Sequence, residues 1–258
     1  MPATLDRLLS GLADSDLIDL SVTLAEHLPA AWPTHMPFQR KVYNWFTARS
    51  EGQVQPVHGF RGPYQTAWLV LDEHAGTHVD APAHFIPPPD SGLPYANEFG
   101  TQTGEKIDLR SLVGPAAVID VSEKALADRD YRITAEDLLA WEEAHGELPQ
   151  GAIVLFRTGY DRYWPDATAY LGTALRGEPG VAALRFPGIS EALARFLTEE
   201  REIAAVGLDT ASLDYGRSQD FIAHRILLDR NIPGFENVAN LGELPPTGAR
   251  VIALPAKI

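Results

Sequence analysis

Three histidines and an aspartate fall within eleven consecutive residues, from His74 to His84. The run reads HAGTHVDAPAH and holds three of the eight histidines of the chain. Imidazole and carboxylate are the usual nitrogen and oxygen ligands of a divalent metal, and such a metal makes water a nucleophile near neutral pH. The chain has no cysteine, so any metal must be held by nitrogen and oxygen. We therefore expect the fold to bring this run together around an ion.

The spacing within the run restricts its backbone. His74, His78 and Asp80 lie at even-numbered positions, so an extended chain would direct all three to one face. A straight strand separates positions i and i+4 by about 13 Å, which is too far for one metal. A helix would bring His74 and His78 together, but Gly76, the β-branched neighbours and Pro82 oppose one. We predict a bent strand that runs into a turn, with His74, His78 and Asp80 as metal ligands.

Composition excludes several functions. The chain has 258 residues, of which 45% are hydrophobic and 22% are charged, as is ordinary for a folded globular protein. Its net charge of −14 would repel nucleic acid. No stretch approaches the roughly 18–20 apolar residues of a membrane span, and the N-terminus lacks the features of a signal peptide. We expect a cytoplasmic protein that binds neither nucleic acid nor membrane.

Apolar runs rich in Val and Ile predict strands buried on both faces. These runs are residues 17–22, 67–71, 116–121, 152–157, 203–208 and 250–254. Helices are predicted at 135–145, opened by Thr134 with Asp137 and stopped by Gly146, and after Ser190. Another is predicted from about 221 to 229. The pattern indicates an α/β (α+β mixed) fold, with helices packed on a mixed sheet in one domain spanning 1–258.

The run from His74 to His84 matches all seven defined positions of H-x-G-T-H-x-D-x-P-x-H, the signature of the cyclase family. On this signature the chain resembles that family, which includes bacterial kynurenine formamidases and isatin hydrolases. The resemblance implies a swivelling β/β/α fold, usually assembled as a homodimer or homotetramer. It extends over nearly the whole chain, through Asp19-Leu20-Ser21, Ala31-Trp32-Pro33 and residues 223–228 and 232–238.

The resemblance also implies residue roles. The three predicted ligands match the metal ligands of the signature, and His84 matches its last histidine, the general acid/base of the family. His224 and Glu236 match the pair that completes a second metal position in dinuclear formamidases, whereas manganese-dependent isatin hydrolases hold one metal. From the residues alone, Pro82 should direct the chain away, so His84 can stand beside the ion as a proton carrier or be a further ligand. His224 could instead be a structural histidine on a helix, and Glu236, in an apolar stretch, needs a cation or hydrogen bonds.

The site supports attack of activated water on an amide carbonyl, with His84 protonating the departing amine. The length of the chain and the segments 43–46 and 207–216 resemble the isatin-hydrolase branch, which implies opening of a cyclic amide, isatin to isatinate. The same resemblance favours Mn²⁺, with Zn²⁺ as the alternative. Other possibilities are an arylformamidase acting on N-formylkynurenine, a lactone or cyclic-imide hydrolase, and a metal-containing binding protein without turnover. An intact His84 argues against the last.

Five residues are candidates for binding the substrate. Trp32, Trp45 and Phe46 could build a flat apolar slot for an aromatic ring, although core packing is the common role of such residues. Tyr215 and Ser218 could donate hydrogen bonds to a substrate carbonyl.

Overall fold

The structure, a computed structural model, describes residues 11, 15–46 and 64–257. Within these residues the main sheet has six strands in the order β10-β4-β6-β8-β9-β3. The four central strands run parallel, and β10 and β3 form the two edges as antiparallel strands. In sheet order the strands are Arg250–Ile252, Val113–Asp120, Ala152–Arg157, Ile203–Leu208, Gly234–Glu236 and His78–Asp80. The predicted mixed sheet is confirmed.

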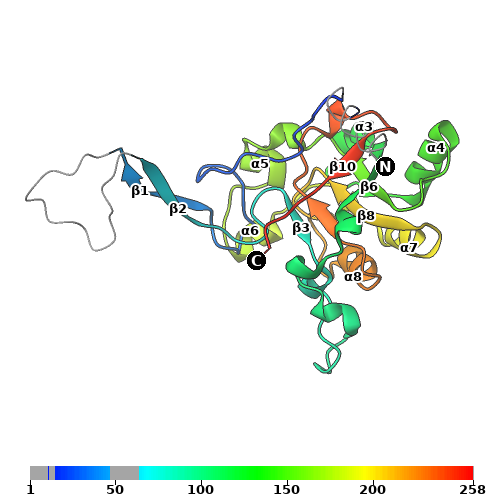
Figure 1. The fold of residues 1–258 in the computed structure, drawn as a ribbon, viewed down its shortest axis with the longest axis horizontal. Helices are drawn as coiled ribbons and strands as arrows, with labels where there is room; N and C mark the ends of the chain where they lie inside the picture. Colours follow the sequence, from blue (N-terminus) through cyan, green and yellow to red (C-terminus); the bar gives the residue numbers. More distant parts are fainter. Residues whose placement is uncertain (1–10, 12–14, 47–63, 258) are drawn as a thin grey trace, which may run out of the picture.

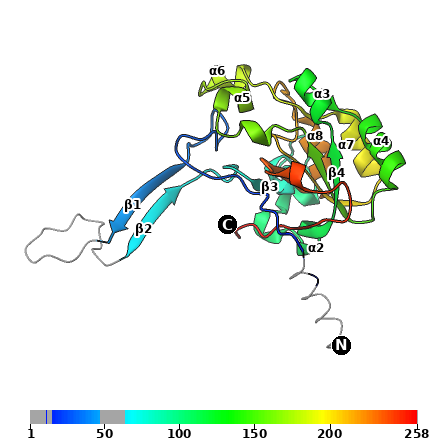
Figure 2. The ribbon, with the colours of Figure 1, turned by 90° about the horizontal axis from the view of Figure 1, so that it is seen from above.

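Side chains of β6 alternate between two apolar layers. Val154 and Phe156 belong to the layer beneath the larger helices, and Ile153 and Leu155 belong to the layer on the opposite face. This alternation buries the strand on both sides, as the continuous apolar sequence predicted. Figure 2 shows the helices that cover the first face on one side of the sheet: α4 (Ala135–His145), α7 (Glu191–Glu199) and α8 (Ile222–Leu228).

The helix ends follow the predicted capping residues. The carboxylate of Asp137 accepts the backbone N–H of Thr134 at 2.8 Å, which caps α4. Gly146 ends that helix with a φ of +92°. The hydroxyl of Ser190 accepts the backbone N–H of Leu193 at 3.1 Å and caps α7. All three predicted helices are therefore confirmed.

Three predicted strands differ from the structure. Residues 250–252 of the run 250–254 form the edge strand β10, where Ile252 is 59% exposed instead of buried. Residues 17–22 form no strand, and Leu17 is 86% exposed. Residues 67–70 lie in β2 (Gln65–Val70), which among the described residues pairs only with β1 (Gln39–Trp45). Trp68 is 49% exposed instead of buried. The hairpin of β1 and β2 stands away from the rest of the described chain (Figures 1 and 2). The apolar run therefore predicted the extended backbone of β2 correctly. It did not predict that the side chains of this strand would be exposed among the described residues.

Short elements connect these parts. Among them, β5 (Arg132–Ile133) and β7 (Gly188–Ile189) pair in parallel. Other helices in the described residues are α2 (Leu109–Leu112), α3 (Ser122–Ala127), α5 (Ala167–Leu171) and α6 (Glu178–Ala182). The 3₁₀ turns lie at Pro82–His84, Glu98–Thr101, Gly104–Lys106, Asp161–Tyr163 and Leu241–Glu243. In the part of the chain that the structure describes, no helix has the length and apolar character needed to cross a membrane.

Candidate metal centre

A tight turn precedes β3 and brings His74 back toward His78. Gly76 lies in this turn with a φ of +68°, in the left-handed region that favours glycine. A Cβ added there would lie 2.5 Å from Leu24 Cδ2, so the side chain of Leu24 would have to shift to admit any other residue. The backbone N–H of His74 donates to Asp72 Oδ1 at 3.0 Å, which fixes the start of the turn. The predicted bend at Gly76 is confirmed.

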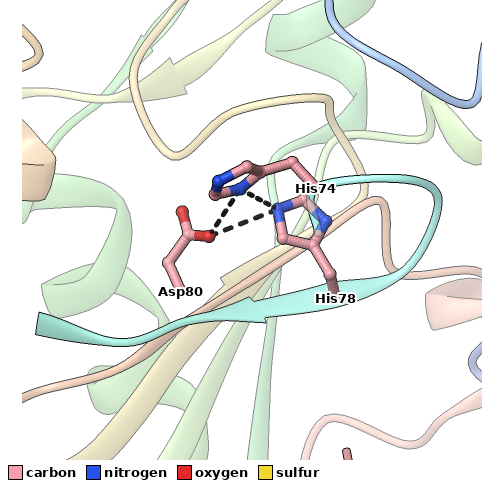
Figure 3. Close-up of side chains that lie close together, drawn as sticks. All are labelled: His74, His78 and Asp80. Atoms are coloured by element: carbon pink, nitrogen blue, oxygen red, sulfur yellow. Dashed lines mark hydrogen bonds and ion pairs between the residues drawn. The ribbon is translucent and has the colours of Figure 1, made fainter. Parts of the chain in front are cut away.

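The first group of candidate ligands is His74, His78 and Asp80 (Figure 3). His74 Nδ1 lies 3.1 Å from His78 Nε2 and 3.0 Å from Asp80 Oδ1, and His78 Nε2 lies 3.3 Å from that same oxygen. The other ring nitrogen of His78, Nδ1, donates to the carbonyl of Gly76 at 2.8 Å, which leaves a lone pair on Nε2 when the ring is neutral. Lone pairs and a carboxylate thus converge on one point.

Asp80 provides the test of whether a cation fits. Its side chain is 1% exposed, and among the described residues its Oδ1 has no partner with hydrogen-bond geometry. A buried acceptor without a donor is costly, and a buried carboxylate requires a compensating charge. A divalent ion between Oδ1 and the two imidazole nitrogens would satisfy both needs, so the residues fit a metal.

A second group shares the carboxylate of Asp80. His224 Nε2 lies 3.1 Å from Asp80 Oδ2 and 2.9 Å from Glu236 Oε1. His84 Nε2 lies 4.0 Å from Asp80 Oδ2, and Asp80, His84 and His224 form a second potential ligand set. Glu236 Oε2 is also 3.3 Å from His78 Nε2, because Glu236 is paired with His78 across β9 and β3. The geometry therefore offers two adjacent metal positions joined by Asp80.

Asp214 orients His224. Its Oδ2 accepts His224 Nδ1–H at 2.7 Å and the backbone N–H of His224 at 3.2 Å, while its Oδ1 accepts the backbone N–H of Ala223 at 3.0 Å. With its proton on Nδ1, a neutral His224 presents a lone pair on Nε2 to Asp80 and Glu236. This is the carboxylate–histidine arrangement that usually supports a metal ligand.

Asn237 supports the turn from the opposite side. Its side-chain amide donates to the carbonyl of Gly76 at 2.8 Å, and its Oδ1 accepts the hydroxyl of Tyr170 at 2.7 Å. Thr77 donates its hydroxyl to the backbone carbonyl of Asn237. The carbonyl of Gly76 is thereby held in place to receive His78 Nδ1–H.

The pKa values reflect this concentration of charge. Burial opposes a charge on His78 and His224, but the neighbouring carboxylates prevail and raise the pKa of both rings well above the usual value. Burial likewise opposes a charge on Asp80, yet the surrounding histidines hold its pKa well below the usual value. His84 differs, because burial lowers its pKa to about 4. The buried carboxylates thus favour positive charge on His78 and His224, whereas the lowered pKa of His84 favours its neutral form.

A cavity opens beside the two ligand groups. Its lining includes His74, His84 and His224, together with the rings of Trp32, His35, Phe85 and Phe221. Trp32 contacts Phe221 with the ring centroids 6.3 Å apart. The cavity thus combines an apolar aromatic wall with the imidazoles of the candidate metal centre.

Four of the predicted substrate-binding residues do not line this cavity. Trp45 and Phe46 lie at the far end of β1 and just beyond it, 58% and 61% exposed. Tyr215 lies beneath the guanidinium of Arg132 at another hollow, and Ser218 accepts the backbone N–H of Phe221. A role for these four in substrate binding stays a prediction, without a contact at the cavity to support it.

Residues 18–215 match the Cyclase family model, which covers more than half of the chain. The chain belongs to the cyclase family. As a cyclase-family protein it is 35% identical over 195 residues to an isatin hydrolase from Roseibium aggregatum, an alignment that covers 74% of this chain and 68% of the relative. It is 30% identical over 246 residues to a kynurenine formamidase from Salinibacter ruber, covering 94% of this chain and 91% of the relative.

Solved structures agree with this assignment. The superposition with isatin hydrolase A from Ralstonia solanacearum covers 98% of this cyclase-family chain and 91% of the isatin hydrolase chain, with a TM-score of 0.80 and 29% identity. The superposition with an isatin hydrolase bound to the product analogue thioisatinate covers 98% of this chain and 93% of that hydrolase chain, with a TM-score of 0.80 and 28% identity. The predicted fold of the cyclase family is therefore confirmed.

The structure brings all six residues expected at the metal centre of this cyclase-family chain into one site: His74, His78, Asp80, His84, His224 and Glu236. Sequence reasoning missed three others, His35, Asp214 and Asn237. Asp214 lies ten residues before its partner His224, outside any local pattern, and Asn237 reaches Gly76 across 161 positions. Only the adjacency of Asn237 to Glu236 was a signal that could have found it.

Proposed function

We propose that this chain is a metal-dependent hydrolase that opens a cyclic amide, converting isatin to isatinate. The observation that carries the proposal is the convergence of His74, His78 and Asp80 on one point beside an aromatic cavity. The similarity to isatin hydrolases in sequence and in fold supports the choice of substrate.

A divalent ion held by these three residues would supply Lewis acidity, which polarises a carbonyl and lowers the pKa of water. His84 would move the proton. Because burial lowers its pKa to about 4, the imidazole is neutral at pH 7 and can accept a proton from the attacking water. The C–N bond of the cyclic amide then breaks as the ring opens, and His84 returns the proton to the nitrogen, which becomes the amine of the product. The ring centroids of His84 and His74 lie 4.1 Å apart, so His84 would hold the proton close to the candidate metal ligands.

The substrate ring would lie against Trp32, Phe85 and Phe221, which line the cavity. Flat apolar side chains of this kind suit a fused aromatic ligand, because such a ligand buries its faces against them.

The preferred ion in this proposal is Mn²⁺, with Zn²⁺ as the alternative, since the donors are all nitrogen and oxygen and suit both metals. His74, His78 and Asp80 form the primary position. His224 and Glu236 complete a second position, which would be filled only if two ions bind.

We also propose that the chain works as one domain and assembles as a homodimer or homotetramer. The projecting hairpin of β1 and β2 supports the assembly. Its side chains Val42, Trp45, Trp68 and Leu69 are each about half exposed or more, from 49% to 58%. A two-stranded hairpin by itself is marginally stable in water, so contact with another copy would stabilise it. Light scattering should then give a mass of two or four chains, and a mass of one chain would contradict the assembly.

The test of function is direct. Purified protein should consume isatin, seen as loss of its visible absorbance, and a chelator should stop the reaction until metal is restored. The kynurenine formamidase relative, aligned over 94% of this chain, favours N-formylkynurenine as the second candidate. Efficient cleavage of N-formylkynurenine without turnover of isatin would replace the proposal by an arylformamidase.

A further inference from the structure

His35 lines the cavity but belongs to neither ligand group. Its ring centroid lies 5.6 Å from that of His74, and its side chain is 35% exposed. The ring therefore faces the space beside the metal centre where a substrate would lie.

The backbone of His35 is held on both sides. Its N–H donates to the carbonyl of Trp32 at 3.0 Å, and its own carbonyl accepts a hydrogen bond from the guanidinium of Arg176. Arg176 also donates to the carbonyl of Ala31 at 3.1 Å. These contacts fix the loop that carries His35, so the imidazole is presented to the cavity at a defined place.

The hydrogen bond at Nδ1 decides what Nε2 can do. Nδ1 lies 3.1 Å from Asp72 Oδ1, the same oxygen that accepts the backbone N–H of His74. A carboxylate only accepts hydrogen bonds, so Nδ1 carries the proton and Nε2 of the neutral ring carries a lone pair. No group among residues 15–46 and 64–257 bonds to Nε2. A residue that lines the cavity thus carries an acceptor nitrogen with a fixed tautomer and no partner in the described chain.

We propose that His35 Nε2 accepts the N–H of the substrate amide and makes His35 a specificity-determining residue for secondary over N-alkylated amides. This inference rests on the proposed amide-hydrolase function and names the group of the substrate that is recognised. In a cyclic amide the N–H and the carbonyl lie on adjacent atoms. A hydrogen bond from that N–H to His35 therefore turns the carbonyl toward the neighbouring His74 and its ligand group. An N-methyl amide would leave Nε2 without a donor, and its methyl group would press against the ring.

The experiment compares kcat/KM for isatin and for N-methylisatin. Wild-type protein should prefer isatin by at least about fivefold, as loss of one hydrogen bond predicts. The variant His35→Leu keeps a side chain of similar size without an acceptor and should bring the ratio of the two kcat/KM values to within about twofold of unity. The variant His35→Gln places an oxygen near the position of Nε2, so it should keep most of the preference. Metal per chain should be equal in all three proteins, because His35 is not a ligand.

Several results would overturn the inference. These are a wild-type ratio near one, a His35→Leu ratio equal to that of wild type, or loss of metal from His35→Leu. The wild-type ratio needs no variant, so a folding defect in a variant does not obscure the outcome. If wild type fails to open isatin, the proposed substrate is wrong, and calorimetry then compares the dissociation constants of the two intact ligands. Tighter binding of isatin that His35→Leu abolishes would still support the role of His35, and equal binding would refute it.

Discussion

Asp80→Asn should remove most of the stabilisation of the protein by divalent metal. Asp80 is the carboxylate shared by both ligand groups, with Oδ1 3.0 Å from His74 Nδ1 and Oδ2 3.1 Å from His224 Nε2. An asparagine keeps one oxygen, loses the negative charge and turns an N–H₂ donor toward one of the two positions. We expect the dissociation constant for metal to rise at least about 100-fold, the upper end of what changes in supporting residues alone produce.

The size of the effect follows from linkage. Free metal at 100 times the dissociation constant raises the free energy of unfolding by about 2.7 kcal/mol. For a chain of this size about 1 kcal/mol corresponds to about 2–4 °C in Tm, so wild type should gain about 5–11 °C. At the same metal concentration Asp80→Asn would be near its own dissociation constant, where the gain is about 0.4 kcal/mol, or about 1–2 °C.

Differential scanning calorimetry of metal-stripped protein, with and without added Mn²⁺ or Zn²⁺, measures this difference. The control is Asp120→Asn, because the Asp120 side chain is 50% exposed and pairs with Arg157 instead of the cluster. Asp120→Asn should keep the full metal-dependent gain in Tm. A gain in Asp80→Asn equal to that of wild type would refute the shared-carboxylate geometry.

Three further predictions concern proton transfer and support of the ligands. His84→Ala should keep metal at the first ligand group but lose about 10²–10⁴-fold in kcat, measured with isatin, and an unchanged rate would contradict the proton-transfer role. Asp214→Asn should weaken the binding of a second ion about 10- to 100-fold, because the buried Nδ1–H of His224 loses a charged acceptor. Competition with a chelator measures this affinity, and an affinity equal to that of wild type would mean that His224 is not a ligand. Because burial lowers the pKa of His84 to about 4, its neutral form persists down to that pH and is lost as the pH falls through about 4. A bound cation would lower that pKa further, so at saturating metal the acid limb of kcat/KM assigned to His84 should lie at or below about pH 4. An acid limb near pH 6.5 that disappears in His84→Ala would contradict this prediction.

The candidate metal centre was largely predictable because its main candidate ligands are local in sequence. His74, His78 and Asp80 are so close together that only a bend could bring them to one point, and Gly76 marks where the chain bends. The helix boundaries were predictable for a similar reason, since Asp137 and Ser190 cap the helices on which they lie. In each case the deciding interaction joins residues no more than six positions apart.

Features set by distant partners could not be predicted in this way. Residues 17–22 read as a strand, but Leu20 instead gives its carbonyl to the backbone N–H of Ala239 and joins no sheet. The apolar pattern of β2 could not show that the described residues place no second layer of side chains over this strand. The tautomers of His35 and His224 depend on Asp72 and Asp214, and those pairings arise only when the loops are folded.

The most direct test of the central claim is the turnover of isatin as a function of metal bound per chain. Metal-stripped protein is titrated with Mn²⁺ or Zn²⁺, bound metal is measured by elemental analysis, and the rate is measured on the same samples. The account predicts no turnover without metal and a rate that rises in proportion to the first ion bound, with no such rise in Asp80→Asn. Full turnover by protein free of metal, or metal bound without any effect of Asp80→Asn, would contradict it.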